Sequence, residues 1–141
     1  REGAELKQLI EDRLSSISER TAVIREMMPT LLTTHRQKLI DRFNDAKLEL
    51  DSTRVEQEIV LLAQKIDVAE ELDRLDTHVA ETRRVLDSKD AIGRRLDFLM
   101  QEFNREANTL GSKAIDTRST QAAVDLKVFI EQMREQIQNI E

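Results

Sequence analysis

Residues 10–28 read IEDRLSSISERTAVIREMM, and their apolar side chains recur at alternating steps of four and three residues. This spacing places every member of the set on one face of an α-helix, as in the seam of a coiled coil. The members of this seam are Ile10, Leu14, Ile17, Thr21, Ile24 and Met28. The stretch therefore predicts a long amphipathic helix that packs against other helices.

The same helical period continues along most of the chain, and no segment alternates in the manner of a β-strand. Further apolar stripes occupy residues 32–50, 55–86, 92–110 and 123–140. We therefore expect an all-α fold of about five helices. An elongated helical hairpin or coiled-coil arm is expected over residues 1–52, followed by a three-helix region over residues 53–141. Because the stripes are long and open, we expect other subunits to complete them.

Pro29 is the only proline of the chain. A proline is tolerated in the first turn of a helix and disrupts a helix interior. We therefore expect Pro29 to open a second helix that folds back on the first.

The segment 53–86 is expected to form one continuous helix. Val60 and Leu61 lie off its main stripe, so we expect its first half to be covered on two faces. Residues 87–93 are the best candidate for a linker, and Gly111 is expected to cap the helix that follows.

Composition narrows the classes of function. The chain carries 22 Lys and Arg against 28 Asp and Glu, a net charge of -6, and it contains 3 Gly and no Cys, Trp or Tyr. These numbers disfavour disulfide frameworks, Cys-based zinc sites and glycine-rich phosphate loops. No apolar run approaches the roughly 20 residues of a membrane span. We expect a soluble, cytoplasmic protein with no membrane partner and, because the chain begins at Arg1 rather than Met, a part of a longer protein.

A line of polar residues lies on one face of the third expected helix. Its members are Asp67, Glu71, Arg74 and His78. Their spacing confines them to an arc of about 60° on the helix surface. Such a line can hold a divalent cation between carboxylate and imidazole, with Arg74 free for a phosphate. The alternative is an exposed stripe joined by Glu71–Arg74 and Glu70–Arg74 ion pairs.

Glu102 and Glu106 form a pair of like charges one helical turn apart in the fourth expected helix. Their repulsion costs an isolated helix a few tenths of a kcal/mol. A metal ion would remove this cost, and two carboxylates with water suit Mg²⁺ or Mn²⁺ better than zinc. Asn104 and Asn108 are poor helix formers with no other obvious reason to stand beside the pair. The alternative is that Arg105, or a Lys or Arg from another helix, neutralises the two carboxylates.

Basic residues gather in one segment of this acidic chain. Residues 91–118 carry a slight positive charge, whereas residues 52–90 and 119–141 are acidic. The basic residues of the segment are Arg94, Arg95, Arg105, Lys113 and Arg118. Any RNA contact made here should be to phosphates and sensitive to salt. Because the four Phe lie on or beside the apolar stripes, base stacking is expected to contribute little.

The stretch GRRLDFLMQEFNREANTLGSKA at residues 93–114 closely resembles the signature of the bacterial YicC/YloC family. Residues 127–141, residues 71–75 and His78 match further blocks of the family. The resemblance covers residues 54–141 closely and the expected arm only loosely.

This resemblance implies that the chain is the C-terminal helical part of a protein that also has an N-terminal domain. It further implies a divalent-metal-dependent endoribonuclease without a small-molecule cofactor. The family resemblance also implies a ring-shaped homo-oligomer, a hexamer, that encloses RNA.

The family's blocks fall on the polar residues already singled out. We expect Glu102 and Glu106, with His78 or Glu71, to hold Mg²⁺ or Mn²⁺. The residues expected to carry the catalysis are Glu102, Glu106 and His78. The expected RNA-binding residues are Arg74, Arg94, Arg95, Arg105, Asn108, Lys113 and Arg134.

Two mechanisms are compatible with these residues. In the first, the metal ion activates a water that attacks the phosphodiester, and arginine and lysine side chains stabilise the charge on the phosphate. In the second, the RNA 2′-hydroxyl attacks with His78 as general base, and the reaction passes through a 2′,3′-cyclic phosphate. A non-catalytic helical scaffold, with the polar blocks at subunit interfaces, is the alternative function, and residues 1–51 could also serve as a docking arm for a partner protein.

Overall fold

The computed structural model describes residues 2–46, 52–88 and 93–139, and all regular structure in these segments is helical. The helices are α1 (Glu2–Asp45), α2 (Ser52–Ile66), α3 (Ala69–Asp87), α4 (Gly93–Lys113) and α5 (Thr117–Gln138). The expected all-α class is confirmed. Among the described helices, none combines the length and the apolar character needed to cross a membrane.

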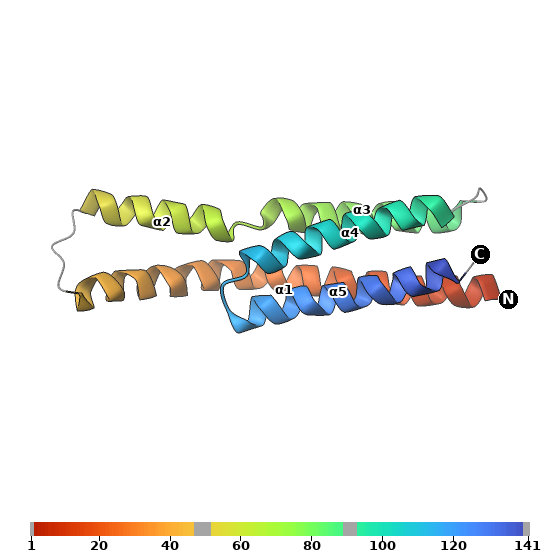
Figure 1. Ribbon diagram of the computed structural model, residues 1–141, viewed down its shortest axis with the longest axis horizontal. Coiled ribbons are helices and arrows are strands. Elements are labelled where there is room, and N and C mark those ends of the chain that lie inside the picture. Colours follow the sequence, from red (N-terminus) through yellow and green to blue (C-terminus); the bar gives the residue numbers. More distant parts are fainter. Residues whose placement is uncertain (1, 47–51, 89–92, 140–141) are drawn as a thin grey trace.

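Helices α3, α4 and α5 form a bundle with the first part of α1 at one end of an elongated molecule, and α2 forms an arm with the rest of α1 at the other (Figure 1). The first part of α1 packs in the bundle with α3 and α5, and α4 closes the ring by packing against both of these helices. Each helix of the bundle runs antiparallel to its neighbours (Figure 1). The second part of α1 leaves the bundle and lies beside α2 (Figure 1).

The bundle core is built from the apolar stripes that the sequence predicts. Ile10, Leu14, Ile17 and Ile24 of α1 are buried, and the buried hydroxyl of Thr21 donates a hydrogen bond to the Ile17 carbonyl at 2.8 Å. The stripes of α4 and α5 are also confirmed, with the following residues buried: Leu96, Leu99, Phe103, Ala107, Leu110, Ala123, Leu126, Ile130, Met133 and Ile137. The predicted stripe members Ile92 and Ile140 lie outside the described residues.

The expectation that Pro29 opens a second helix is wrong, because Pro29 lies inside α1. The buried face passes from Ile24 to Met27 and Leu31 without a break, so the apolar seam continues across the proline. Burial of these side chains offsets the missing backbone hydrogen bond of the proline, since each fully buried aliphatic side chain contributes about 1.5–3 kcal/mol.

The hairpin arm is therefore not residues 1–52. The arm pairs the C-terminal part of α1 with α2, and the residues that join them, 47–51, lie outside the described part of the chain. The expectation that α2 is covered on two faces is also wrong, because Val60 is 53% exposed and Leu61 is 58% exposed. The arm has one packed face and one face open to solvent.

The single helix expected over residues 53–86 is interrupted at Asp67 and Val68. Ile66 and Val68 are both buried. In a continuous helix, side chains two positions apart are rotated by about 200° and point to nearly opposite sides. The break lets both side chains enter the core. The Asp67 carboxylate accepts a hydrogen bond from the backbone N–H of Ala69 at 3.0 Å, which satisfies a free donor at the start of α3.

The ends of α4 and α5 also differ from expectation. Gly111 does not cap α4, which continues to Lys113. The helix α5 begins at Thr117, six residues before the predicted stripe at 123–140, because Asp116 caps it. The Asp116 carboxylate accepts a hydrogen bond from the backbone N–H of Ser119 at 2.7 Å, and the Ser119 hydroxyl accepts one from the Asp116 backbone N–H at 3.4 Å. This reciprocal pair is a capping box in which serine replaces the usual Glu or Gln.

Replacement of Pro29 by alanine should stabilise the protein. Alanine restores a backbone donor in the interior of α1. Proline also restricts the unfolded chain, so its removal offsets part of this gain. We expect the free energy of unfolding to rise by about 2 kcal/mol. Urea denaturation of Pro29→Ala measures the effect, with Thr30→Ala at the neighbouring exposed position as control. An unchanged or lowered stability would show that α1 needs the proline.

The cap of α5 should depend on pH. Partial burial raises the pKa of Asp116, but the hydrogen bonds from the Ser119 hydroxyl and backbone outweigh it, and the net pKa is lowered. Because the pKa of Asp116 is lower in the folded protein than in the unfolded chain, its stabilising effect is complete above the unfolded pKa of about 3.9. This effect is lost as the pH falls through the pKa of Asp116 in the folded protein. Asp116→Ala should therefore lose about 1 kcal/mol at pH 7 and progressively less below about pH 4. Urea denaturation across this range checks the difference, and Glu19→Ala, which removes an exposed carboxylate of α1, is the control.

Candidate functional site

Charged residues interrupt the apolar contact between α3 and α4. We call this group the polar seam, and its members are Glu71, Arg74 and His78 of α3 with Glu106 and Lys113 of α4. Because α3 and α4 are antiparallel, the beginning of α3 meets the end of α4 (Figure 1). Three members of the expected polar line, Glu71, Arg74 and His78, therefore face α4. The fourth member, Asp67, precedes α3 and is exposed.

Glu71 and Lys113 form the first ion pair of the polar seam. The Lys113 Nζ lies 2.9 Å from the Glu71 Oε1 and donates a second hydrogen bond to the Asp67 carbonyl oxygen, also at 2.9 Å. Glu71 is buried, and its Oε2 has no hydrogen-bond partner among the described residues. One oxygen of this carboxylate is thus neutralised and the other is left as an unused acceptor.

Arg74 and Glu106 form the second ion pair. The Arg74 Nη1 lies 3.6 Å from the Glu106 Oε1, and the same guanidinium also pairs with Glu70 one turn earlier on α3. Glu106 is 2% exposed, and its Oε2, like that of Glu71, finds no partner in the described part of the chain. A buried polar atom without a partner is rare in folded proteins and often marks a place for water, an ion or a catalytic group.

His78 lies between the two helices near Phe103. The two rings form a T-shaped contact, with a centroid distance of 5.7 Å and an interplanar angle of 74°. Both ring nitrogens are buried and make no hydrogen bond to described residues, and the closest carboxylate oxygen, Glu81 Oε2, is 3.9 Å from Nδ1. The described residues therefore leave both ring nitrogens of the imidazole without a hydrogen bond.

In the structure, ion pairs form in both carboxylate clusters, although not all of them are the expected ones. The predicted Glu70–Arg74 pair is present, but Glu71 pairs with Lys113 instead of Arg74. Glu106 is neutralised by an arginine of another helix, and Glu102, one turn earlier, is only half-buried and pairs with no cation in the described segments.

The polar seam offers donor atoms for a divalent cation but no complete ligand set. Across the described residues, no three Asp, Glu or His side chains form a group that could hold a metal ion. Hard cations such as Mg²⁺ are often held by one or two carboxylates, with water filling the other positions. The unused Oε2 atoms of Glu71 and Glu106 fit that pattern, and we take these two residues as the metal candidates with the best structural support.

The predicted RNA-binding residues do not converge on one point. Arg74 and Lys113 belong to the polar seam, whereas Arg105 and Asn108 are exposed elsewhere on α4. Arg134 lies on α5 and pairs with Glu131 of the same helix at 3.8 Å.

Arg94 and Arg95 are exposed in the first turn of α4, where Arg84 and Phe98 line the same groove. Sequence reasoning missed Arg84 and Phe98. The available signal was that Phe98 falls outside the stripe formed by Leu96, Leu99 and Phe103.

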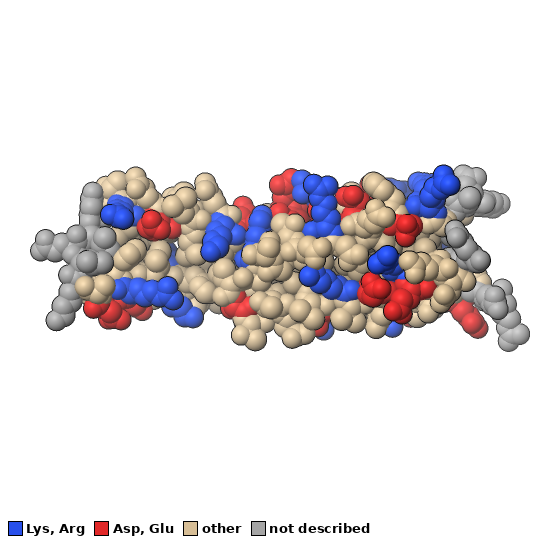
Figure 2. All heavy atoms as spheres, viewed as in Figure 1, with Lys and Arg blue, Asp and Glu red and all other residues tan. Residues whose placement is uncertain are grey.

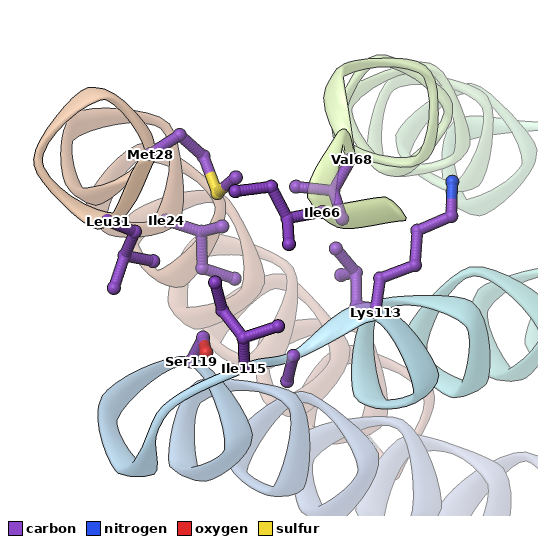
Figure 3. A pocket seen from close by; sticks show the side chains of 10 residues that line it. Ile24, Met28, Leu31, Ile66, Val68, Lys113, Ile115 and Ser119 are labelled. Carbon is purple, nitrogen blue, oxygen red and sulfur yellow. The ribbon is translucent and has the colours of Figure 1, made fainter. Parts of the chain in front are cut away.

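A second hollow lies where the base of the arm meets the α4–α5 connection (Figure 3). Apolar side chains from α1, from the α2–α3 break and from the connection line most of it, including Ile24, Ile66, Val68 and Ile115 (Figure 3). Its volume of about 20 Å³ has room for a single water. This hollow is a packing defect and is too small for a substrate.

The fold and the polar seam define an elongated all-α bundle protein whose central helix interface contains buried, incompletely paired carboxylates. Residues 24–141 match the family model described as endoribonuclease YicC-like, C-terminal, and the chain belongs to that family. The resemblance drawn from residues 93–114 is thereby confirmed, and the match extends into α1 and the arm.

Two curated relatives carry the name probable endoribonuclease YicC. The protein from Haemophilus influenzae is 58% identical over 141 residues, which cover 100% of this chain and 49% of the relative. The protein from Clostridioides difficile is 36% identical over 143 residues, which cover 99% of this chain and 49% of that relative. The chain thus spans about half the length of the curated relatives that it matches.

The Glu71–Lys113 pair should behave as a coupled unit. Lys113→Met leaves a buried carboxylate without its cation, and we expect the free energy of unfolding to fall by about 1–3 kcal/mol. The double variant Glu71→Gln/Lys113→Met should recover most of this loss, because the carboxylate charge is removed together with its partner. Urea denaturation of the single and double variants measures the coupling, with Lys127→Met on the exposed face of α5 as control. Purely additive effects would contradict the pairing.

Proposed function

We propose that this chain is the C-terminal helical part of a divalent-metal-dependent endoribonuclease that cleaves RNA phosphodiester bonds in the cytoplasm. The observation that carries the proposal is the polar seam, where two buried carboxylates each keep one oxygen without a partner among the described residues. Membership of the YicC-like family and the printed name of the relatives, probable endoribonuclease, support RNA as the substrate.

Glu106 and Glu71 are the residues that we propose to hold Mg²⁺ or Mn²⁺, with Glu102 as a further carboxylate on the same face of α4. When bound, such an ion would supply Lewis acidity and a water of lowered pKa at neutral pH. Arg74 and Lys113 reduce the repulsion between the carboxylates while leaving the second oxygen of each available. The two basic side chains therefore stabilise the buried carboxylates and leave one oxygen of each to bind a metal ion.

Other basic residues of α4 and α5 supply phosphate contacts in this proposal. Arg105 and Arg134 are exposed, and their planar guanidinium groups match the geometry of phosphate oxygens. Asn108 adds an exposed amide on α4.

His78 offers a second route to cleavage. Its nitrogens make no hydrogen bond to described residues, so one of them is free to accept the proton of a 2′-hydroxyl. Both routes place the reaction at the polar seam, and they differ in the products.

A specific observation favours a second function, a non-catalytic scaffold within a homo-oligomer such as a hexamer. Glu71 and Glu106 each already have a cation partner, as expected of ion pairs that align two helices. Under this reading the seam fixes helix packing, and the open face of the arm supports assembly. Substitutions in the seam would then change the mass of the assembly instead of the rate of cleavage.

Cleavage of a labelled RNA by the full-length protein tests the proposal. Glu106→Gln and Glu71→Gln should each reduce the rate by about 100-fold or more, the effect usual for removal of one catalytic group, while EDTA should abolish the activity. Glu19→Gln, on the exposed face of α1, is the matched control. Circular dichroism and light scattering confirm that each variant keeps its fold and its mass.

The outcomes separate the alternatives. Wild-type rates in both seam variants would refute the site, and dissociated but otherwise folded subunits would favour the scaffold. Mass spectrometry of the product ends distinguishes the routes: 2′-hydroxyl attack passes through a 2′,3′-cyclic phosphate, and hydrolysis by water does not.

A further inference from the structure

A groove opens between the end of α3 and the beginning of α4, away from the polar seam. Its volume is about 670 Å³. We call it the arginine groove, and its lining residues are Glu81, Arg84, Val85, Arg94, Arg95, Phe98 and Leu99. Figure 2 shows Lys and Arg side chains gathered at this end of the molecule, where α3 ends and α4 begins.

Phe98 is unusual among the aromatic residues of the chain. It is 60% exposed, whereas Phe103, on the same helix, is fully buried. Val85 and Leu99 are buried and form an apolar floor to the groove. The bundle core does not use the Phe98 ring, so the ring is available to an external partner.

The arginines of the groove have no acidic partner among the described residues. Arg84, Arg94 and Arg95 make no ion pair with any described residue, although the chain has a net charge of -6. In contrast, Arg25 on α1 pairs with both Asp73 and Asp76 of α3 at 2.7 Å. Three unpaired guanidinium groups around one hollow form a site for anions on an acidic protein.

We propose that the arginine groove binds a single-stranded segment of the RNA substrate, with one base stacked on Phe98 and the adjacent phosphates held by Arg84, Arg94 and Arg95. Guanidinium groups pair with phosphate oxygens in a bidentate manner, and aromatic faces stack on any base that is not already paired. This inference rests on the proposed function and adds a strand-anchoring subsite to it. The earlier expectation that base stacking contributes little is revised for this one residue.

The position of the groove connects it to the polar seam. Glu81, which lines the groove, lies 3.9 Å from the imidazole of His78 in the seam. Along α4, Phe98 and Glu106 are eight positions apart, a rise of about 12 Å. A strand anchored on Phe98 can therefore reach the carboxylates of the seam within a few nucleotides.

Fluorescence anisotropy with the full-length protein tests the subsite. The probe is a short fluorescein-labelled oligouridylate of 2′-O-methyl nucleotides in EDTA, so that binding is measured without cleavage, and a hairpin duplex of the same chemistry serves for comparison. Phe98→Leu keeps an apolar side chain and removes the aromatic face, and it should weaken single-strand binding about tenfold while leaving the duplex unaffected. Arg94→Gln/Arg95→Gln should lower the slope of log Kd against log salt by about 1.4, because each phosphate contact to a single strand contributes about 0.7.

Two matched controls are available on other helices. Val128→Ala changes an exposed apolar residue of α5, and Arg54→Gln removes an exposed arginine of α2. Both should bind the probe as the wild type does.

Wild-type affinity and salt slope in the groove variants would overturn the subsite, and the proposed function would stand if those variants still cleave RNA. A loss of assembly mass in Phe98→Leu would also overturn it, by identifying the groove as a contact between protein subunits. If the wild-type protein neither binds nor cleaves RNA, the proposed function itself fails.

Discussion

Glu71 and Glu106 are buried carboxylates on facing helices, and each must meet a cation from the opposite helix. Lys113 of α4 reaches back to Glu71, while Arg74 of α3 reaches across to Glu106. A shift of one turn between the helices would leave two charges buried and unpaired, a change that typically destabilises a protein by several kcal/mol. The apolar stripes hold the helices together, but the crossed pairs define the register in which α3 and α4 meet. The position of His78 beside Phe103, and the groove at the other end of the interface, follow from that register.

The helix α1 provides the second constraint, since it belongs to both parts of the molecule. Its seam is buried from Ile10 to Ile24 in the bundle and continues through Met27 and Leu31 toward the arm. Arg25 adds a polar clamp to α3 through Asp73 and Asp76 close to the place where the arm leaves the bundle. The interruption at Asp67 and Val68 lies between α2 and α3, which both pack against α1. It allows α2 to pack in the arm and α3 to pack in the bundle without forming one continuous helix.

Much of the fold could be predicted from local pattern alone. The stripes that contain Leu14, Phe103 and Leu126 follow the helical period closely, and periodicity is a property of neighbouring residues. Pro29 misled the prediction because its local penalty is outweighed by burial across the seam, which depends on packing. The break at Val68 also depends on packing, because its cause is the need to bury Ile66 and Val68 together.

The candidate site was predictable only in part for the same reason. That Glu71, Arg74 and His78 share one helix face follows from spacing, but their partners on α4 require the helix register. The position of Phe98 outside the stripe of α4 is visible in the sequence, but its exposure beside a groove depends on how α3 and α4 pack.

The distribution of charge explains how an acidic chain can present an anion-binding surface. Arg25, Arg83 and Lys113 pair with carboxylates of neighbouring helices, so part of the positive charge of the bundle is neutralised within the molecule. The arginines at the α3–α4 end have no such partners in the described part of the chain, and Glu81, the carboxylate that shares their groove, lies close to His78. At physiological salt the Debye length is about 8 Å, so an approaching phosphate responds to these nearby arginines more than to the net charge of the whole chain. Local composition at the helix ends, more than the overall balance of charge, therefore determines where an anionic polymer can bind.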